Sequence, residues 1–524
     1  PFTVDGGNVT RPTDPSQARM AEQGGAGDAE KRFVLQSVSV EGAKVAKPES
    51  FEAYYREWIG KAVSLKDLNQ IADAMTAAMR NKGYILYKVI VPRQDISEGR
   101  VRFQAIEGYI NGVVVEGEVS GRADLWRYWI KQIKAERPIT AVVLERYTLL
   151  ANDLAGKTVK SVLRPAKGVP GASDLVLKVT KKSVEANLTI DNRASPTTGP
   201  NEVTAVWSMA NAVGFGEKLS LTYNMAIDRE KMEYVAVQMD TPINGEGTTA
   251  TVSGTSSKSA PGNELKELEM TSESFVFATS LMHPLIRRRD ENFKVFGGFT
   301  YTDAKSEALS SRLYEDKLRT INIGMSYSLK DYLDGENVLS LSTTQGFEWF
   351  GATTPDDDFR SRDNGQTDFT KFTLNASRLQ KLPKNLSLSA IFSGQLASAP
   401  LLSSEEFSFG GSSYGRAFDS SEITGDHGMA FASEIQYTMK PGVAYMKYLQ
   451  PYVFWDFGAT WDIDVEEDKA RRTGSSAGLG LRFGITDHFS GGLEMAQPLT
   501  RSVSSANEGN GDDPRFFFTL SGLY

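Results

Sequence analysis

The stretch INIGMSYSLK, residues 321–330, decides the fold because its side chains change character at every step. Apolar or aromatic residues occupy the odd positions from Ile321 to Leu329, and small or polar residues occupy the even positions. This two-residue period is typical of a β-strand with one apolar face and one polar face. The pattern recurs in KLSLTYNMAI (218–227), NLSLSAIF (385–392) and LGLRFGI (479–485), which predicts β-structure for the C-terminal part of the chain.

The connections between these strands differ in length in a regular way. About sixteen strand candidates follow residue 184, with roughly 21 residues for each strand and its connection, enough for membrane-spanning strands of about 9–11 residues. Tight links alternate with long polar ones along the chain. The tight links include 211–217, 242–247 and 484–488, and the long ones include 256–271, 351–368 and 500–514.

A soluble β-sandwich would show the same alternation within its strands, so the connections have to distinguish the two architectures. Short turns on one side, long loops on the other and an even number of strands are typical of an outer-membrane β-barrel. A closed barrel also leaves no unpaired strand edge in lipid. No run of about 18 apolar residues occurs, which excludes a transmembrane helix. We therefore predict an antiparallel transmembrane β-barrel over residues 184–524.

Residues 33–183 show a different pattern, in which helical and strand periods alternate twice. In the first module, 33–108, Ser64 is the predicted N-cap of a helix over 64–83. The apolar positions of that helix are Leu68, Ile71, Met75 and Met79. Strands are predicted over 33–42, 84–92 and 100–108.

The second module, 109–183, repeats this order of elements. Its helices are predicted over 122–136 and 142–156, and its strands over 110–118, 159–166 and 173–182. Neither module carries a cluster of catalytic residue types, and modules of this kind bind chains more often than they catalyse reactions. The polar, glycine-containing residues 1–32 are expected to hold one short helix, over 15–23, and a linker.

Composition narrows the class of protein. The net charge of −8 argues against a nucleic-acid-binding protein, which would present a basic surface. The chain has no cysteine, which fits the periplasm or outer membrane and also fits a compact protein that never needed thiols. The acidic stretches 355–358 and 462–468 are interpreted as solvated faces rather than calcium sites, so no metal and no cofactor is predicted.

The stretch GGSSYGRAFDSSEITGDHG, residues 410–428, contains the spelling G-x-S-x-G around Ser413. A hydrolase nucleophile at this position would need a helix directly after it, and histidine and acidic partners downstream. Glycine, aspartate and serine follow instead of a helical pattern, and the only downstream histidines are His427 and His488. We therefore predict no catalytic residue and no enzyme.

Arg416 lies in the same long loop, among small residues. An arginine in solvent would carry no functional meaning, but in a loop folded into a barrel its guanidinium would need a carboxylate partner. Asp456 is a candidate, because it interrupts the aromatic-rich stretch PYVFWDFGAT (451–460) and cannot face lipid at low cost. The alternative for Asp456 is an ordinary pore-lining carboxylate.

With these segments in order, the chain resembles the TpsB transporters of two-partner secretion, the haemolysin secretion/activation family of the BamA-like outer-membrane superfamily. The resemblance runs from about residue 10 to Tyr524, and HPLIRRRDENF (283–293) is similar to a periplasmic turn of the family. It implies a mixed fold of two tandem α+β POTRA (polypeptide-transport-associated) modules and a 16-stranded barrel. The implied POTRA bounds are 33–108 and 109–183, with residues 1–32 as a plug helix and linker.

Two short motifs are the most specific part of the resemblance. Family members carry Arg-Gly-aromatic and then Gly-Asp-x-Gly in the sixth extracellular loop, here about 397–427. The loop is expected to fold into the lumen, where its arginine pairs with the aspartate of an F-x-D-x-G motif on a barrel strand. The matching residues here are Arg416, Ala417 and Phe418, then Gly425, Asp426 and Gly428, and on the strand Phe454, Asp456 and Gly458. Ala417 stands where the family has glycine.

The resemblance implies export of one large TpsA-type exoprotein across the outer membrane of a Gram-negative bacterium, with the POTRA modules docking it in the periplasm. Outer-membrane lipid, lipopolysaccharide and the barrel-assembly machinery are further expected partners, nucleic acid is not, and a monomer is expected. The C-terminal assembly signal would be Phe516, Phe518, Leu520 and Tyr524. The alternatives are a barrel-assembly insertase of the same superfamily and a passive porin, which would have no use for residues 33–183.

Overall fold

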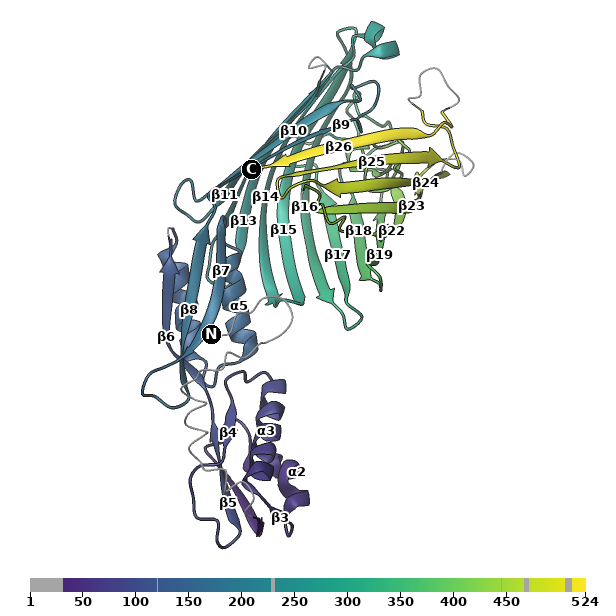
Figure 1. The fold of residues 1–524 in the computed structure, drawn as a ribbon. Helices are drawn as coiled ribbons and strands as arrows, with labels where there is room; N and C mark the ends of the chain where they lie inside the picture. Colours follow the sequence, from purple (N-terminus) through teal and green to yellow (C-terminus); the bar gives the residue numbers. More distant parts are fainter. Residues whose placement is uncertain (1–31, 120, 228–230, 444, 466–470, 505–510) are drawn as a thin grey trace. The chain divides into compact units, whose positions relative to one another are not determined.

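The computed structural model describes residues 32–119, 121–227, 231–443, 445–465, 471–504 and 511–524. The expected plug helix and linker lie outside these residues, apart from Arg32. The chain divides into two compact units, residues 1–181 and 182–524, which are described separately (Figure 1).

The first unit contains two small α+β modules with the same sheet topology. In the first module the strand order is β2-β5-β4, with β2 parallel and β4 antiparallel to β5. In the second module the order is β6-β8-β7, with β6 parallel and β7 antiparallel to β8. The elements of the first module are β1 (Phe33–Val34), β2 (Ser37–Glu41), η1 (Pro48–Phe51), α2 (Glu52–Tyr55), η2 (Arg56–Trp58), β3 (Ala62–Val63), α3 (Leu65–Asn81), β4 (Lys88–Ile90) and β5 (Arg100–Ile106). Those of the second are β6 (Tyr109–Gly117), α4 (Ala123–Ala135), α5 (Ala141–Asn152), β7 (Lys157–Pro165) and β8 (Ala172–Lys181).

Helix α3 forms where its sequence predicts it. The Ser64 hydroxyl accepts a hydrogen bond from the Asp67 amide, and the Asp67 carboxylate accepts one from the Ser64 amide, so two free amide groups at the helix start are satisfied. The hydrogen bonds from Ser64 hold the pKa of Asp67 below its usual value. The four predicted apolar positions of the helix are all buried in the module core: Leu68, Ile71, Met75 and Met79.

Two predicted strands of the first module are shorter than expected. The segment 33–42 changes partner at Leu35, so that β1 pairs with β3 and β2 pairs with β5. In the segment 84–92 only β4 is a strand, because the chain turns at Tyr84, whose carbonyl accepts from the Tyr87 amide. This turn packs Ile85 and Leu86 against the core of the second module. The alternation of apolar residues there reflects contact between the modules rather than sheet formation.

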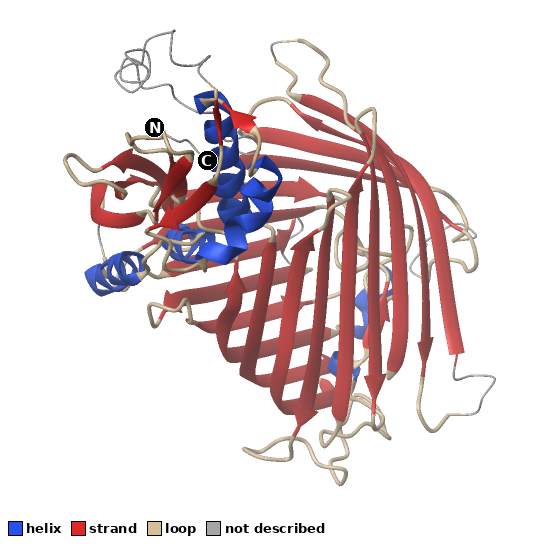
Figure 2. Cartoon of the chain, turned by 90° about the horizontal axis from the view of Figure 1, so that it is seen from below, coloured by secondary structure: helices blue, strands red, loops and turns tan. Residues whose placement is uncertain are grey.

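The second unit is a closed barrel of sixteen strands, in which each strand is antiparallel to its neighbours. Figure 2 shows these strands as the continuous red wall. The barrel closes where β26 pairs with β9, from Thr519↔Asp191 to Leu523↔Asn187. The strands are β9 (Val184–Asp191), β10 (Glu202–Ala210), β11 (Lys218–Ala226), β12 (Met232–Pro242), β13 (Thr249–Ser259), β14 (Thr271–Arg287), β15 (Glu291–Ala308), β16 (Ser311–Lys330), β17 (Gly335–Gly346), β18 (Thr370–Lys381), β19 (Leu386–Ala397), β22 (His427–Tyr437), β23 (Tyr448–Trp461), β24 (Arg471–Gly484), β25 (Phe489–Pro498) and β26 (Arg515–Leu523). The antiparallel barrel predicted from the two-residue period is confirmed, and so are the sixteen strands implied by the family resemblance.

The two faces of the barrel wall differ as the sequence predicts. One face carries exposed apolar side chains, among them Ile323, Trp455 and Leu493. The other face carries small and polar residues and, on β23, the fully buried Asp456. An apolar face suits lipid, so the face of Asp456 is the lumen. Among the residues that the structure describes, no helix is long and apolar enough to cross a membrane.

Candidate functional site: a loop anchored in the barrel lumen

The segment between β19 and β22, residues 398–426, is named loop 6 here. It contains the short helical turn η4 (Ser403–Glu405) and a small hairpin of β20 (Phe407–Phe409) and β21 (Ile423–Gly425). The hairpin places Phe409, Phe418 and Ile423 in a buried apolar cluster with Ala430 of the barrel wall. Loop 6 therefore has its own packed core against the lumen side of β22.

Arg416 lies at the inner end of loop 6 and is 5% exposed. Its Nε donates to Asp456 Oδ2 at 3.1 Å and its Nη2 donates to Asp456 Oδ1 at 2.9 Å, which is a bidentate pair. The Arg416 backbone amide also donates to Asp456 Oδ2, at 2.9 Å. The structure thus brings together the two residues that the sequence paired, through both side chain and backbone.

Asp456 is 0% exposed, and Ser476 on β24 donates a further hydrogen bond to its Oδ2, at 3.3 Å. The guanidinium of Arg416 also lies over the ring of Phe454, 3.6 Å from the ring centre. A buried carboxylate is stable only where such donors replace water. The F-x-D-x-G strand therefore provides an aromatic surface and a carboxylate for one arginine.

Two further carboxylates complete the surroundings of Arg416. Its Nη1 donates to Glu434 Oε2 on β22 at 2.6 Å and lies 3.9 Å from Glu494 Oε2 on β25. Glu434 also accepts from Arg482 on β24, and Glu494 accepts from Arg193 in the connection after β9. Three arginines thus face three carboxylates, so the network is formally neutral.

Glycines in the motifs allow the loop and the wall to approach each other. A Cβ on Gly458 would overlap the ring of Phe409, which packs directly on this glycine. A Cβ on Gly428 would overlap Phe407, and one on Gly425 would lie 2.9 Å from the Cβ of Thr460. The motif glycines at these positions are therefore required by close packing between loop 6 and β22–β23.

Ala417 replaces the family glycine without strain in the backbone. It is not among the described residues with a left-handed φ, whereas Gly415, two positions earlier, has φ +73°. Ala417 is 0% exposed and packs in a cluster with Phe454 of β23 and Phe517 of β26. The methyl group occupies this contact, so the conformation of the loop tip tolerates alanine.

The second motif anchors the outer end of loop 6. Asp426 Oδ1 accepts from Arg362 Nη1 at 2.5 Å and from the Leu401 amide at 2.7 Å, and its Oδ2 accepts from the Ile463 amide at 2.8 Å. Arg362 belongs to the connection between β17 and β18. Asp426 thus joins three extracellular connections at one carboxylate.

Burial and neighbouring charges shift the pKa values of the ionisable groups at this outer anchor. Burial raises the pKa of Glu406, against the opposing effect of Arg362, whose Nη1 lies 3.3 Å from Glu406 Oε1. Burial is the largest single effect and would lower the pKa of Arg362, but the hydrogen bond to Asp426 and the charges of Glu406, Asp426 and Asp462 together outweigh it, so the pKa is raised. Arg362 therefore stays charged while three carboxylates surround it: Asp426, Glu406 and Asp462.

Several of these residues were not predicted from the sequence. Glu434, Arg482 and Glu494 all lie on lumen-facing positions of strands, and Arg193 and Arg362 lie in connections. A charged residue at a lumen position of a predicted strand is a signal for the first three, since such a residue needs a partner. Nothing in the local sequence marks Arg362, because its partner is 64 residues away.

The serine of the G-x-S-x-G spelling is followed by turns and not by a helix. Ser413 lies in a bend, and the chain continues into the turn that Phe418 closes by donating to the Gly415 carbonyl. His427 Nδ1 accepts from the backbone amide of Ala397. No group of three or more metal-ligating side chains occurs in the parts of the chain that the structure describes.

The last strand presents the predicted terminal residues on its outward face. Phe516, Leu520 and Tyr524 are exposed, and Phe518 is intermediate on the same face. Phe517, between them, is buried and points to the lumen, where the guanidinium of Arg193 lies 4.5 Å from its ring centre.

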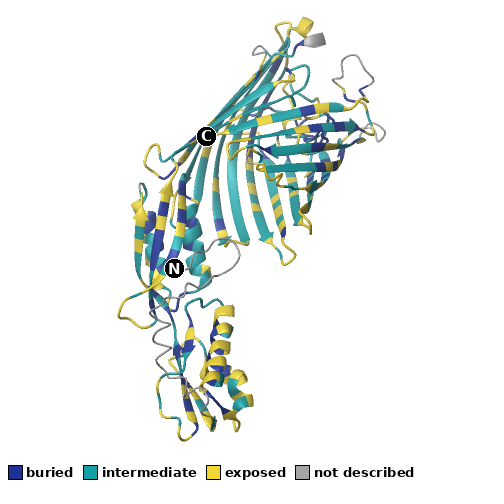
Figure 3. Cartoon of the chain, in the orientation of Figure 1, coloured by how far each residue is buried: buried dark blue, intermediate teal, exposed yellow. Residues whose placement is uncertain are grey.

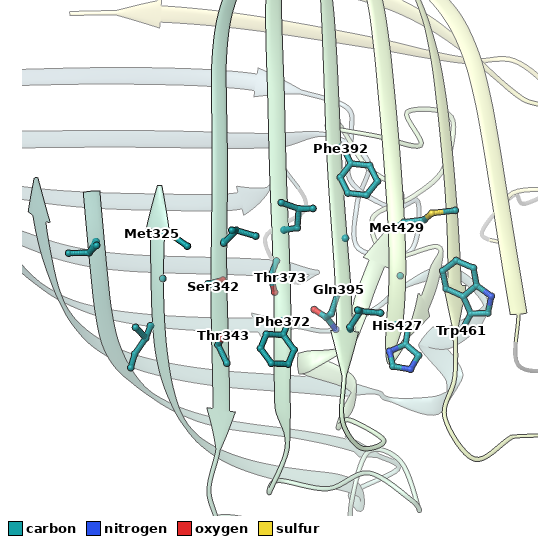
Figure 4. A pocket seen from close by; sticks show the side chains of 18 residues that line it. Met325, Ser342, Thr343, Phe372, Thr373, Phe392, Gln395, His427, Met429 and Trp461 are labelled. Carbon is teal, nitrogen blue, oxygen red and sulfur yellow. The ribbon is translucent and has the colours of Figure 1, made fainter. Parts of the chain in front are cut away.

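One apolar hollow of the barrel wall faces outward, on the opposite side of the wall from the lumen. It has a volume of about 940 Å³ and is lined on the lipid side by apolar side chains of neighbouring strands, including Phe372, Phe392, Met429 and Trp461 (Figure 4). It is a feature of the membrane-facing surface and contributes no residue to the arginine network.

Residues 171–482 match the family described as haemolysin secretion/activation protein ShlB/FhaC/HecB, and residues 33–108 match the ShlB-type POTRA domain. The chain belongs to the haemolysin secretion/activation family. It is an outer-membrane β-barrel transporter of this family, with an N-terminal POTRA domain on the periplasmic side.

Two known transporters of comparable length are similar in sequence to this chain. The heme/hemopexin transporter protein HuxB of Haemophilus influenzae (strain 86-028NP) is 23% identical over 461 residues, 86% of this chain and 81% of that protein. The outer membrane transporter CdiB of Escherichia coli is 22% identical over 482 residues, 89% of this chain and 79% of that protein.

Solved structures show the same fold. CdiB from Escherichia coli superimposes with a TM-score of 0.75 at 20% identity, over 99% of this chain and 93% of that one. BamA from Haemophilus ducreyi lacking POTRA domains 1–3 gives a TM-score of 0.54 at 12% identity, over 94% and 100%. At these identities the likeness concerns the fold alone, and the fold is nearer to the transporter than to BamA.

Proposed function

We propose that this transporter exports one large TpsA-type exoprotein through the barrel lumen, and that the Arg416–Asp456 pair is the latch that holds loop 6 inward. The observation that carries the proposal is the bidentate pair, made by two residues that are 5% and 0% exposed. A buried bidentate pair fixes the position and orientation of the loop that carries the arginine. It performs no covalent chemistry, so the proposed activity is transport and not catalysis.

We also propose that residues 109–183 form a second POTRA module and that both modules dock the unfolded partner in the periplasm. Support comes from the sheet of the second module, which has the same strand order and directions as that of the matched module. Both sheets have free edge strands, to which an extended peptide can add by backbone hydrogen bonds. For the rest of the chain, we propose that residues 1–32 are the plug helix and linker and that residues 184–524 are the barrel domain.

Co-expression tests the export proposal. The chain is produced together with a candidate exoprotein, chosen as any large, repeat-rich secreted protein encoded beside its gene, and the amount of that protein in the medium is measured. Release that depends on the transporter is the expected result, and deletion of residues 33–181 should abolish release while leaving a folded barrel. Equal release with and without the transporter would contradict the proposal, and unchanged release after the deletion would favour a passive porin.

The remaining partners are proposed on the same basis. The outward face of β26, with Phe516, Phe518, Leu520 and Tyr524, is the proposed signal for the barrel-assembly machinery. Replacing Phe516 and Phe518 by alanine should lower the amount of folded barrel in the outer membrane, and normal amounts would contradict the role.

We propose a monomer surrounded by outer-membrane lipid and lipopolysaccharide, which native mass spectrometry tests by counting chains per particle.

A further inference from the structure

The lumen of this barrel has two unlike walls. The lumen face can be followed from Asp456 around the barrel by strand register, for example from Gly428↔Gln395 to Gln395↔Thr373, Thr373↔Ser342 and Ser342↔Gly324. More than half of the residues named below for this face on β12–β17 are serine or threonine, and none of them is charged. Charged residues of the same face border this surface: Asp240 pairs with Thr251, Lys294 with Ser326, and Asp316 with Ala304. This surface is named the hydroxyl wall. Its residues are Tyr234, Ala236, Gln238, Thr251, Ser253, Thr255, Ser257, Ser274, Val276, Ala278, Ser280, Gly298, Thr300, Thr302, Ala304, Asn322, Gly324, Ser326, Ser328, Ser340, Ser342 and Thr344.

Loop 6 covers the other wall and leaves the hydroxyl wall open. The lumen-facing residues of β22–β25 are buried along most of their length, including Glu434, Phe454 and Glu494. None of the residues named for the hydroxyl wall is buried, whereas Asp316, Leu318 and Thr320, on the same face of β16, are buried. Figure 3 shows this contrast, with dark blue gathered on β22–β25 and teal along β13–β16. By strand order, β13 and β14 stand opposite β23 and β24 in the sixteen-membered ring.

The chemistry of the hydroxyl wall suits a surface along which a chain moves. Hydroxyl groups can donate and accept hydrogen bonds with an extended backbone in many registers, so polar groups of a passing chain stay satisfied. Charged residues stand only at the border of this surface, so over most of it a side chain of the passing polypeptide meets no partner for a deep ion pair. Transport through a pore requires binding at many weak sites, which permits both entry and departure.

Resting on the proposed export function, we propose that the exported polypeptide crosses the barrel as an extended chain along the hydroxyl wall, opposite loop 6. The surface selects for an unfolded chain rather than for one sequence. The wall on β22–β25 holds loop 6 and the arginine network, and takes no part in guiding the chain.

The absence of native cysteine makes a direct test possible. Ser253→Cys, Ser280→Cys and Ser342→Cys each place one thiol on the hydroxyl wall. Ser389→Cys on β19 and Ser490→Cys on β25 are matched controls, since both are lumen-facing serines beside the loop-6 wall. The probe is an unstructured polypeptide of glycine, serine and threonine with a single cysteine, added under mild oxidation to the full-length transporter in liposomes.

We expect several-fold more disulfide-linked probe at the three wall positions than at the two controls. Equal or greater linkage at Ser389→Cys and Ser490→Cys overturns the assignment of the path, and so does a lack of linkage at all five positions. Each variant is also assayed for release of the co-expressed exoprotein. Normal release together with linkage on the loop-6 side overturns the path alone, whereas no release by the unmodified transporter overturns the proposed export function.

Discussion

Arg416 is a buried charged residue, so its neighbours must compensate its charge for the folded structure to be stable. Breaking a buried ion pair by removing one partner costs about 3–5 kcal/mol, because the other charge is left uncompensated. Here Asp456 and Glu434 both contact the guanidinium, so the loss of Arg416 leaves two buried carboxylates without it. Displacement of loop 6, with entry of water, is the least costly response.

A single methyl group at Gly458 tests the packing of loop 6 on the wall. We expect Gly458→Ala to displace Phe409, because the added Cβ would overlap its ring, and to make loop 6 more sensitive to protease from outside the cell. Gly522→Ala is the matched control, since a Cβ there meets nothing within 4 Å. Equal protease sensitivity of the two variants would show that Phe409 does not hold the loop.

At this scale the sequence identifies some partners and not others. The pairing of Arg416 with Asp456 follows from the family motifs, and the lumen direction of Asp456 follows from strand alternation alone. Glu434 and Glu494 could have been proposed from the same alternation, because FASEIQY and GGLEMAQ place a charge on the lumen face. Arg362 could not, because the contact depends on how two long connections fold together.

Loop 6 is an element with two anchors at different depths. The inner anchor is formed by Arg416 of loop 6 and the carboxylates of β22–β25 that it contacts. The outer anchor is formed by Asp426 of loop 6 and Arg362. The hairpin of β20 and β21 links them, since Gly425 ends the hairpin and Asp426 follows directly. The two anchors have no residue in common, so they can be released separately.

Removal of the outer anchor should loosen the outer part of loop 6 first. We expect Arg362→Ala to raise the hydrogen-exchange rate of β20 and β21 amides at least about tenfold, as loss of more than about 1.4 kcal/mol of local stability would do. Arg288→Ala is the control, because it breaks an exposed ion pair with Glu291 that is worth little. Unchanged exchange in β20 and β21 of the Arg362 variant would refute the outer anchor.

Elements with strong periodicity were the predictable ones. The sixteen strands and helix α3 follow from local pattern, since burial on one face fixes each of them. The prediction of a strand at Tyr84–Tyr87 was wrong. This segment forms a turn, and its apolar residues pack against the core of the second module. The hairpin within loop 6 has strands of three residues, too short for periodicity to reveal.

At the scale of the whole molecule, an exporter and an insertase differ in how they use the seam between the first and last strands. An insertase of this superfamily would work at a seam between the first and last strands. Here β9 and β26 join through five residue pairs, and Thr189 donates to Ser521 across the seam at 3.2 Å. The side chain of Asn192 adds two further bonds, to the carbonyl of Phe516 and from the amide of Phe518.

Locking that seam should leave export intact. In the cysteine-free chain, Thr189→Cys with Ser521→Cys places two thiols at a directly paired position, and oxidation can join them. We expect the oxidised and reduced forms to release the co-expressed exoprotein equally. Loss of release on oxidation, restored by reductant, would favour opening at the seam over passage through the lumen.

The most direct test of a transporter governed by an inward latch is the export and pore behaviour of latch variants. We expect Arg416→Ala and Asp456→Ala to assemble as barrels of normal amount, to show altered single-channel conductance in planar bilayers, and to release clearly less of the co-expressed exoprotein. Arg416→Lys should be intermediate, because lysine keeps the charge and loses the bidentate geometry. Normal export and unchanged conductance in both alanine variants would contradict the latch.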